Sequence, residues 1–209
     1  SDSRAGAKLL DWMTKLADDK APPELKLDIN RAARSSQSKP PINWQPLEER
    51  RRKRDEPPGD PLGRYRISLY GGNPENGRAL FAGSGRVQCT RCHKVGNEGG
   101  VAGPDLSKVA TRHTPEALLE SLILPDNKIA PGYGSIAVSL ISGKVLAGII
   151  KKESPTAITL ETSDGKQVEI PLSEIEERTA PKSAMPAVSP DDLNLRDFRD
   201  LMAYLTSLK

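Results

Sequence analysis

The feature that most constrains this chain of 209 residues is the run Cys89-Thr90-Arg91-Cys92-His93. Two thiols separated by two residues and followed at once by an imidazole are typical of covalent c-type haem attachment. The thiols add to the two vinyl groups of the porphyrin, and the histidine that follows can then reach the iron as an axial ligand. The run therefore predicts one covalently attached haem c on Cys89 and Cys92, with His93 as an iron ligand.

Three other interpretations of this run stay open from the residues alone. A structural zinc site uses four ligands, generally as two separated pairs, and the chain has only two cysteines and two histidines. A thioredoxin-like redox pair places its dithiol at the start of a helix after a core strand, whereas Gly83-Ser84-Gly85 precedes Cys89. A chance match without haem is the third. Haem attachment fits the surrounding residues best.

The composition excludes some other classes of function. The formal net charge of +3 is only mildly basic, and with 4% aromatic residues the arginines are not interleaved with stacking side chains, so we expect no nucleic-acid partner. No run of about 18 apolar residues occurs, so we expect no transmembrane segment in this chain. Hydrophobic residues make up 36% of the chain, which is little for a large core, and a bound macrocycle would add apolar surface.

Changes in composition along the sequence predict three regions. Residues 1–33 form a short helical segment, which could be the tail of a helical-repeat region. Residues 34–72 are rich in serine, proline and charge, which is typical of a linker. Residues 73–209 form the haem domain, and a β-rich insertion interrupts it at about residues 134–175.

The haem domain shows clear signals for individual elements. A short helix is expected over residues 74–82, a second begins at Thr114-Pro115, and a last helix is expected to be capped by the segment 189–192. Alternation and β-branched residues predict about four antiparallel strands inside the insertion, with Ser142-Gly143 and Asp164-Gly165 as hairpin turns. The strands are expected at 135–141, 145–151, 157–162 and 167–170.

These elements, in this order, resemble the class I cytochrome c family. A short helix precedes the attachment run, Gly103-Pro104-Asp105-Leu106 follows it, and Met185-Pro186 precedes the C-terminal helix. The resemblance implies a mainly α cytochrome c fold, here with a small antiparallel β insertion (α+β), preceded by a short helical segment and linker. It also implies that the Pro104 carbonyl accepts a hydrogen bond from His93 and that Met185 is the second iron ligand.

The residues alone leave the second iron ligand open. Met13 and Met202 each lie on an apolar helical face, where methionine generally fills the core. Met185 lies in a loop next to a proline, and His113, which stands just before a helix cap, would instead give bis-histidine ligation. Tyr133, at the entrance to the β insertion, could approach a haem propionate.

The β insertion extends the resemblance to the haem-binding domain found at the C-termini of large planctomycete and verrucomicrobial dehydrogenase-like proteins. The similarity covers roughly residues 73–209, and that family prefers a leucine where Ala184 stands. It implies a dehydrogenase domain upstream of the haem. The matching stretches are 76–81, 89–93, 103–106, 129–133, 142–148 and 183–186.

The expected function is single-electron transfer by a monohaem c-type cytochrome domain, rather than catalysis. A redox partner protein or an upstream dehydrogenase domain would supply the electrons. Because c-type haem is attached outside the cytoplasm, we expect a periplasmic or otherwise extracytoplasmic location. The alternative is a haem protein whose sixth position is open or labile and which acts as a peroxidase or as a gas or redox sensor. The β insertion would serve as a lid over the haem edge or as a docking surface for a partner.

Overall fold

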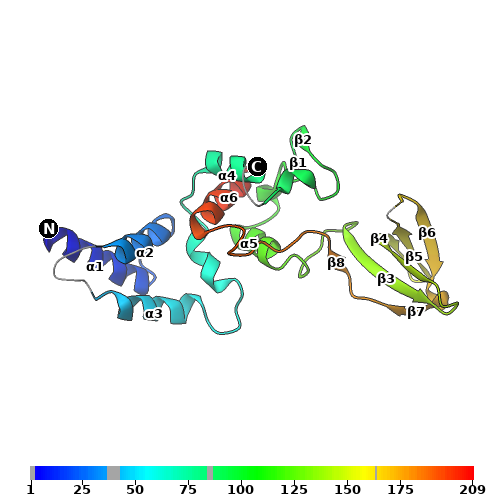
Figure 1. The fold of residues 1–209 in the computed structure, drawn as a ribbon, viewed down its shortest axis with the longest axis horizontal. Helices are drawn as coiled ribbons and strands as arrows, with labels where there is room; N and C mark the ends of the chain where they lie inside the picture. Colours follow the sequence, from blue (N-terminus) through cyan, green and yellow to red (C-terminus); the bar gives the residue numbers. More distant parts are fainter. Residues whose placement is uncertain (1–2, 37–42, 84–86, 163) are drawn as a thin grey trace. The chain divides into compact units, whose positions relative to one another are not determined.

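A computed structural model describes residues 3–36, 43–83, 87–162 and 164–209 (Figure 1). The chain divides into two compact units. Residues 1–89, 107–119 and 188–209 form the first, and residues 90–106 and 120–187 form the second. The fold combines helices with antiparallel sheets, in agreement with the predicted α+β class. Among the described residues, no helix has both the length and the hydropathy needed to cross a bilayer.

The first unit begins with three helices that share a small apolar core. These are α1 (Ser3–Ala17), α2 (Lys26–Ser35), which follows the 3-10 turn η1 (Pro23–Leu25), and α3 (Gln45–Asp55). The apolar residues of α1 recur at helical spacing, so one face is buried while the other stays in water. The core consists of Met13, Leu16, Ala21, Ile29 and Ala33, and Trp12, Trp44 and Leu47 pack against it.

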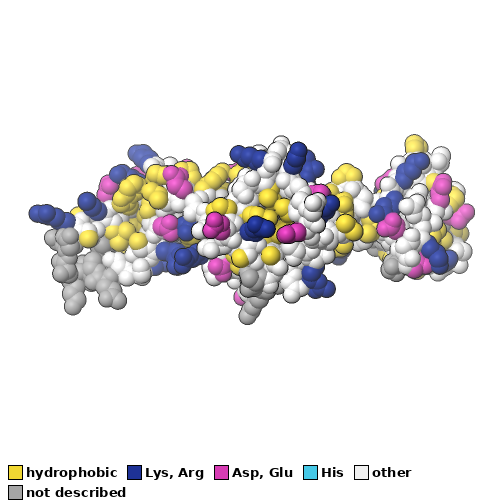
Figure 2. All heavy atoms as spheres, turned by 90° about the horizontal axis from the view of Figure 1, so that it is seen from above, with side chains coloured by type: hydrophobic (Ala, Val, Ile, Leu, Met, Phe, Trp, Pro, Cys, Tyr) yellow, Lys and Arg dark blue, Asp and Glu magenta, His cyan; other side chains and the backbone are white. Residues whose placement is uncertain are grey.

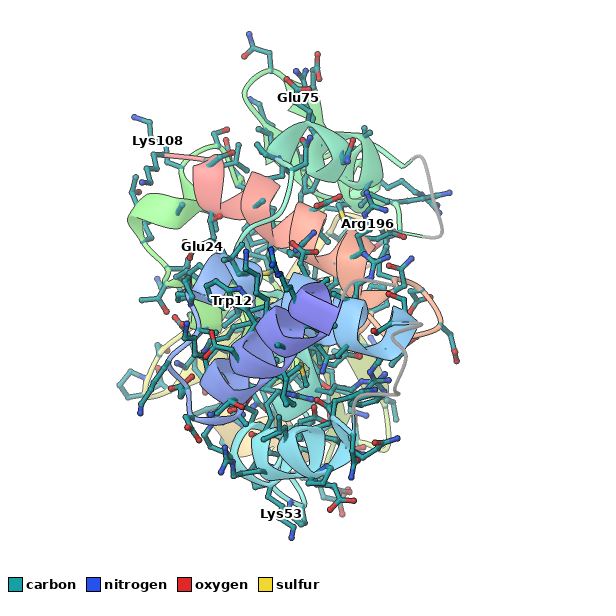
Figure 3. All side chains as sticks on the ribbon, turned by 90° about the vertical axis from the view of Figure 1, so that its left-hand side faces the viewer. Trp12, Glu24, Lys53, Glu75, Lys108 and Arg196 are labelled. Atoms are coloured by element: carbon teal, nitrogen blue, oxygen red, sulfur yellow. The ribbon has the colours of Figure 1, made fainter. Side chains whose placement is uncertain are left out.

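Part of the region predicted as a linker is helical. Helix α3 and the 3-10 helix η2 (Gly63–Ser68) both lie within residues 34–72, whereas residues 37–42 lie outside the described part of the chain. The charged sequence of α3 folds because Glu48 and Arg51 are buried together, with 6% and 3% of their surface exposed. Figure 3 shows Lys53 extending from α3 toward the periphery.

Helices α4 (Pro74–Phe81) and α6 (Leu195–Ser207) pack closely in the same unit. Gly77 permits the approach, because a Cβ built there would lie 2.0 Å from the carbonyl oxygen of Asp200. The Phe81 and Tyr204 rings lie 5.4 Å apart between their centroids on the same interface. The Asp200 carboxylate accepts the Asn73 backbone N–H at 2.8 Å, which fixes the start of α4.

The expected cap of the last helix is wrong. Helix α6 begins at Leu195, and Asn194 is its N-cap, since the Asn194 side chain accepts the N–H groups of Arg196 and Asp197. The Asp192 carboxylate is already engaged by both the N–H and the hydroxyl of Ser189, at 2.8 and 2.6 Å. The segment 189–192 therefore closes a separate turn before the helix.

The second unit contains a six-stranded antiparallel sheet in the described part of the chain. Its order is β6-β5-β4-β3-β7, and β8 also pairs with β3. The first four strands and both hairpin turns match the predicted insertion, while β7 and β8 extend the sheet beyond it. The strands are β3 (Gly134–Leu140), β4 (Val145–Glu153), β5 (Ala157–Glu161), β6 (Gln167–Pro171), β7 (Ile175–Arg178) and β8 (Lys182–Ser183).

This sheet curls on itself (Figure 1). Strands β6 and β7 stand at opposite ends of the strand order, yet only η5 (Leu172–Glu174) separates them in the chain. In a flat sheet the two would lie about 19 Å apart, whereas the four residue steps from Pro171 to Ile175 span at most about 14 Å. The edges must therefore approach each other, and the curl encloses one apolar core of Ile136, Val138, Leu140, Ile158, Leu160 and Ile170.

Candidate functional site

The attachment run lies on a short turn of helix followed by an extended segment. The 3-10 helix η3 (Cys89–Arg91) carries the first cysteine, and Cys92 and His93 follow its end. Cys89 is half-buried, Cys92 is exposed, and no disulfide joins the two thiols. The His93 ring is half-buried. Both thiols are thus accessible to a macrocycle beside the turn.

The glycine-rich loop after His93 is held against the attachment run by backbone hydrogen bonds. The hairpin of β1 (Lys94–Val95) and β2 (Glu98–Gly99) turns the chain around. Three backbone N–H groups then donate, at 2.8 Å each, to the carbonyls of every second residue from Thr90 to Lys94. The pairs are Gly100 to Thr90, Gly103 to Cys92 and Leu106 to Lys94. The loop therefore fixes the backbone on which His93 stands.

Two glycines allow the backbone of the loop to lie this close to the backbone of the attachment run. A Cβ at Gly99 would lie 2.2 Å from the His93 carbonyl oxygen, and one at Gly100 would lie 2.2 Å from that of Arg91. Gly99 also has φ +105°, a conformation that other residues rarely adopt. The three glycines within Gly96–Gly100 are themselves a sequence signal of close backbone approach.

The His93 ring is oriented by a backbone acceptor. Its Nδ1 lies 2.9 Å from the Pro104 carbonyl oxygen, which is the contact that the cytochrome resemblance predicts. A carbonyl can only accept, so Nδ1 must carry the proton, and Nε2 then keeps a lone pair for a metal. A hydrogen bond of this kind fixes the tautomer and the ring plane of a metal-binding histidine. That His93 binds iron stays a prediction, and the geometry of its ring fits that role.

Gly103 lies directly against this ring, which gives a testable consequence. A Cβ at Gly103 would lie 2.8 Å from Cε1 and 2.9 Å from Nδ1 of His93. We expect Gly103→Ala to push the ring off its Pro104 acceptor and to lower the free energy of unfolding of the haem-loaded protein by about 1–3 kcal/mol, the usual cost of overpacking. Urea unfolding followed by the haem absorbance measures this change.

Gly96→Ala is the matched control for this variant. It changes the same loop at φ +61°, where a Cβ would meet nothing within 4 Å. Only backbone strain of about 1 kcal/mol is expected there. Equal urea midpoints for the two variants would contradict the proposed contact between position 103 and the ring.

The structure places Met185 in a short loop after β8. Its side chain is half-buried, and its backbone N–H donates to the Ser183 hydroxyl at 3.1 Å. Met185 and His93 both belong to the second unit. Ala184, the residue that departs from the family pattern, is exposed. The assignment of Met185 as an iron ligand stays a prediction.

Tyr133, expected near a haem propionate, and His113, the alternative iron ligand, lie in different surroundings. Tyr133 is half-buried just before β3, and its backbone N–H donates to the Ala130 carbonyl at 3.1 Å. His113 is exposed before α5 (Pro115–Ile123), and Thr114 caps that helix by accepting the Ala117 N–H. The propionate contact of Tyr133 and the ligand role of His113 both stay predictions.

The donor set fits a covalently attached haem. It provides two accessible thiols, an imidazole whose Nε2 is left for the iron, and a glycine that leaves room beside the ring. Across the described ranges, no group of three or more His, Cys, Asp or Glu side chains is placed to hold a metal ion. Acidic and basic side chains are interspersed on the face in Figure 2, in keeping with the nearly balanced charge of the chain.

Comparison with known families agrees with this geometry. Residues 74–144, about a third of the chain, match the model of the family described as Cytochrome c. The match contains α4, the attachment run, the glycine-rich loop and α5. A comparison with curated proteins finds no significant match. The chain therefore carries a cytochrome c domain sequence at residues 74–144, and with it the covalently attached haem c and the electron-transfer chemistry of that family.

Proposed function

We propose that this chain is a monohaem electron-transfer module in which His93 and Met185 would hold the iron. The observation that carries the proposal is the 2.9 Å contact between His93 Nδ1 and the Pro104 carbonyl oxygen beside the two cysteines. This contact leaves Nε2 as a permanent, well-oriented ligand. A second protein ligand would close the iron to substrates and would favour electron transfer over catalysis at the metal.

When bound, the haem supplies the one-electron redox couple of its iron. The chain's own residues do the rest. Cys89 and Cys92 hold the macrocycle by thioether bonds, Pro104 fixes the His93 ring, and Met185 supplies a neutral thioether sulfur. A methionine ligand raises the reduction potential relative to a second histidine, so the module is suited to accept electrons from an organic donor through a dehydrogenase.

The proposed electron donor is a dehydrogenase, either a separate partner or a domain of the same longer protein. The resemblance of residues 73–209 to the haem-binding domain of dehydrogenase-like proteins supports this part of the proposal. Maturation of c-type haem outside the cytoplasm supports a periplasmic or otherwise extracytoplasmic location. Fusion of a dehydrogenase to the haem domain would keep the two redox centres at high effective concentration.

Met185→Leu tests the ligand assignment. The substitution removes the sulfur but keeps the volume, so the fold should lose less than about 1.5 kcal/mol. We expect the weak far-red absorption of the methionine–iron(III) bond to disappear completely. We also expect the reduction potential to fall and the reduced protein to bind carbon monoxide. Optical spectra of the oxidised and reduced holoprotein measure the first and last effects.

Met13→Leu and Met202→Leu are matched controls, since they remove the other two methionines from buried helical positions. Both should keep the far-red band. If the unsubstituted holoprotein lacks the band and already binds carbon monoxide, Met185 is not the ligand. A peroxidase or a gas or redox sensor with an open iron would then be the better description.

A further inference from the structure

The turn after α5 and the methionine loop are joined by a short chain of hydrogen bonds. The Asp126 carboxylate accepts the backbone N–H of Ser183 at 2.7 Å. The Ser183 hydroxyl in turn accepts the backbone N–H of Met185 at 3.1 Å. All three residues belong to the second unit. The position of the Met185 backbone therefore depends on a carboxylate that lies 59 residues earlier in the sequence.

Strand β3 also holds the same segment. Strand β8 pairs with it through only two residues, Gly134 with Ser183 and Ser135 with Lys182. The Ser135 hydroxyl also donates to the Lys182 carbonyl at 3.1 Å. A ladder of two residue pairs is weak by itself, so the hydrogen bond to the Asp126 carboxylate adds to what holds this segment.

Asp126 lies in a turn that is itself held in place by hydrogen bonds. It lies in the turn after α5, where the Asn127 backbone N–H donates to the Leu124 carbonyl at 3.0 Å. The Asn127 side chain also donates to Glu120 at 3.1 Å. The turn is therefore tied to the end of the helix. A carboxylate that accepts a backbone N–H forms a stronger bond than a neutral acceptor does.

We propose that Asp126 and Ser183 are positioning residues that hold the Met185 loop. We also propose that the β insertion anchors this loop through the pairing of β3 with β8. The inference rests on the proposed role of Met185 as the second iron ligand. A thioether is a weak ligand, and it competes with added ligands only because the fold holds it near the metal at high effective concentration. Loosening the loop lowers that concentration and frees the sixth position.

The test is the affinity of the oxidised holoprotein for imidazole, which must displace the methionine sulfur before it binds. The apparent dissociation constant is the intrinsic one divided by the fraction of protein with a detached methionine. A hydrogen bond to a charged group is worth roughly tenfold to a hundredfold in an equilibrium constant. We expect Asp126→Ala to tighten imidazole binding by about tenfold, while the far-red band falls only by the added fraction of detached methionine.

Two further variants separate positioning from general damage to the fold. Asp126→Asn keeps an acceptor oxygen but loses the charge, so its affinity for imidazole should lie between those of wild type and Asp126→Ala. Ser183→Ala removes only the contact with the Met185 N–H, and it should tighten imidazole binding by a few-fold, as expected for a neutral hydrogen bond.

Asp164→Ala is the matched control. It removes another exposed aspartate of the same unit, whose carboxylate accepts the Thr162 hydroxyl at 2.5 Å in a hairpin turn.

The outcomes distinguish this inference from the proposed function. If Met185→Leu loses the far-red band but Asp126→Ala binds imidazole no more tightly than Asp164→Ala, the ligand assignment holds and the positioning role is overturned. If Met185→Leu leaves both the spectrum and the imidazole affinity unchanged, both proposals fail together. A graded series, with Asp126→Ala strongest and Asp126→Asn between it and wild type, supports the positioning role.

Discussion

Replacing Glu48 by alanine is expected to lower the free energy of unfolding of the first unit by about 2–3 kcal/mol, the cost of removing a charged acceptor from a buried hydrogen-bond network. The Glu48 carboxylate accepts the Nε and Nη2 hydrogens of Arg51, both at 3.0 Å. It also accepts Asn30 at 2.6 Å and Arg34 at 2.9 Å. Without it, the Arg51 guanidinium, whose side chain is 4% exposed, keeps only Asp55 and Glu56 as acidic partners in the structure.

Tryptophan fluorescence during urea unfolding measures this loss. The chain has two tryptophans, Trp12 and Trp44, and both pack against the core of the three N-terminal helices. Glu49→Ala is the matched control, because Glu49 is the exposed neighbour on the same helix and should change stability by less than about 0.5 kcal/mol. Similar urea midpoints for the two variants would show that the buried network contributes little.

The same network predicts how stability depends on pH. Burial alone would raise the pKa of Glu48, but the hydrogen bonds and charges of Arg51 and Arg34 outweigh it and hold that pKa below its ordinary value of 4.5. The unfolded state therefore binds the proton more readily than the folded state does. The stabilisation is complete above pH 4.5 and is lost as the pH falls through the lower, folded-state pKa. The difference in stability between wild type and Glu48→Ala should shrink over that acidic range.

Gly77→Ala is expected to cost about 3 kcal/mol, at the upper end of the range for overpacking. The added Cβ would lie 2.0 Å from the carbonyl oxygen and 2.6 Å from the carbonyl carbon of Asp200. These are backbone atoms of α6, so no side chain can turn aside and the two helices must separate. The higher helix propensity of alanine recovers only about 1 kcal/mol. The separation would also disturb the hydrogen bond between Asp200 and the start of α4.

Thermal unfolding of the holoprotein, followed by far-ultraviolet circular dichroism, measures the effect of Gly77→Ala. Gly132→Ala is a suitable control, since its φ is +82° and a Cβ there meets nothing within 4 Å. It should lose only about 1 kcal/mol through backbone strain. If Gly77→Ala melts at or above the temperature of this control, α4 and α6 do not pack at the observed distance.

Local sequence determined the elements whose signals are short in range. The cysteine spacing and the adjacent His93 predict haem attachment, because that chemistry depends on neighbouring residues of one turn. The hairpin strands and their glycine turns were also predictable, since alternation and positive-φ glycines act over a few residues. Gly143 and Gly165 do have positive φ, at +81° and +78°.

The tertiary structure decided what depends on residues far apart in the chain. Helix α3 reads as a charged linker, and it folds because Glu48 meets Asn30 and Arg34 from another helix. The curl of the sheet follows from β7 pairing with β3 after a three-residue connection, and no local pattern encodes that pairing. The contact of Asp126 with Ser183 spans 57 residues. Sequence periodicity shows which face of a helix or strand is apolar. Only the folded chain fixes which distant polar groups meet, because burial by the rest of the fold stabilises each such pair.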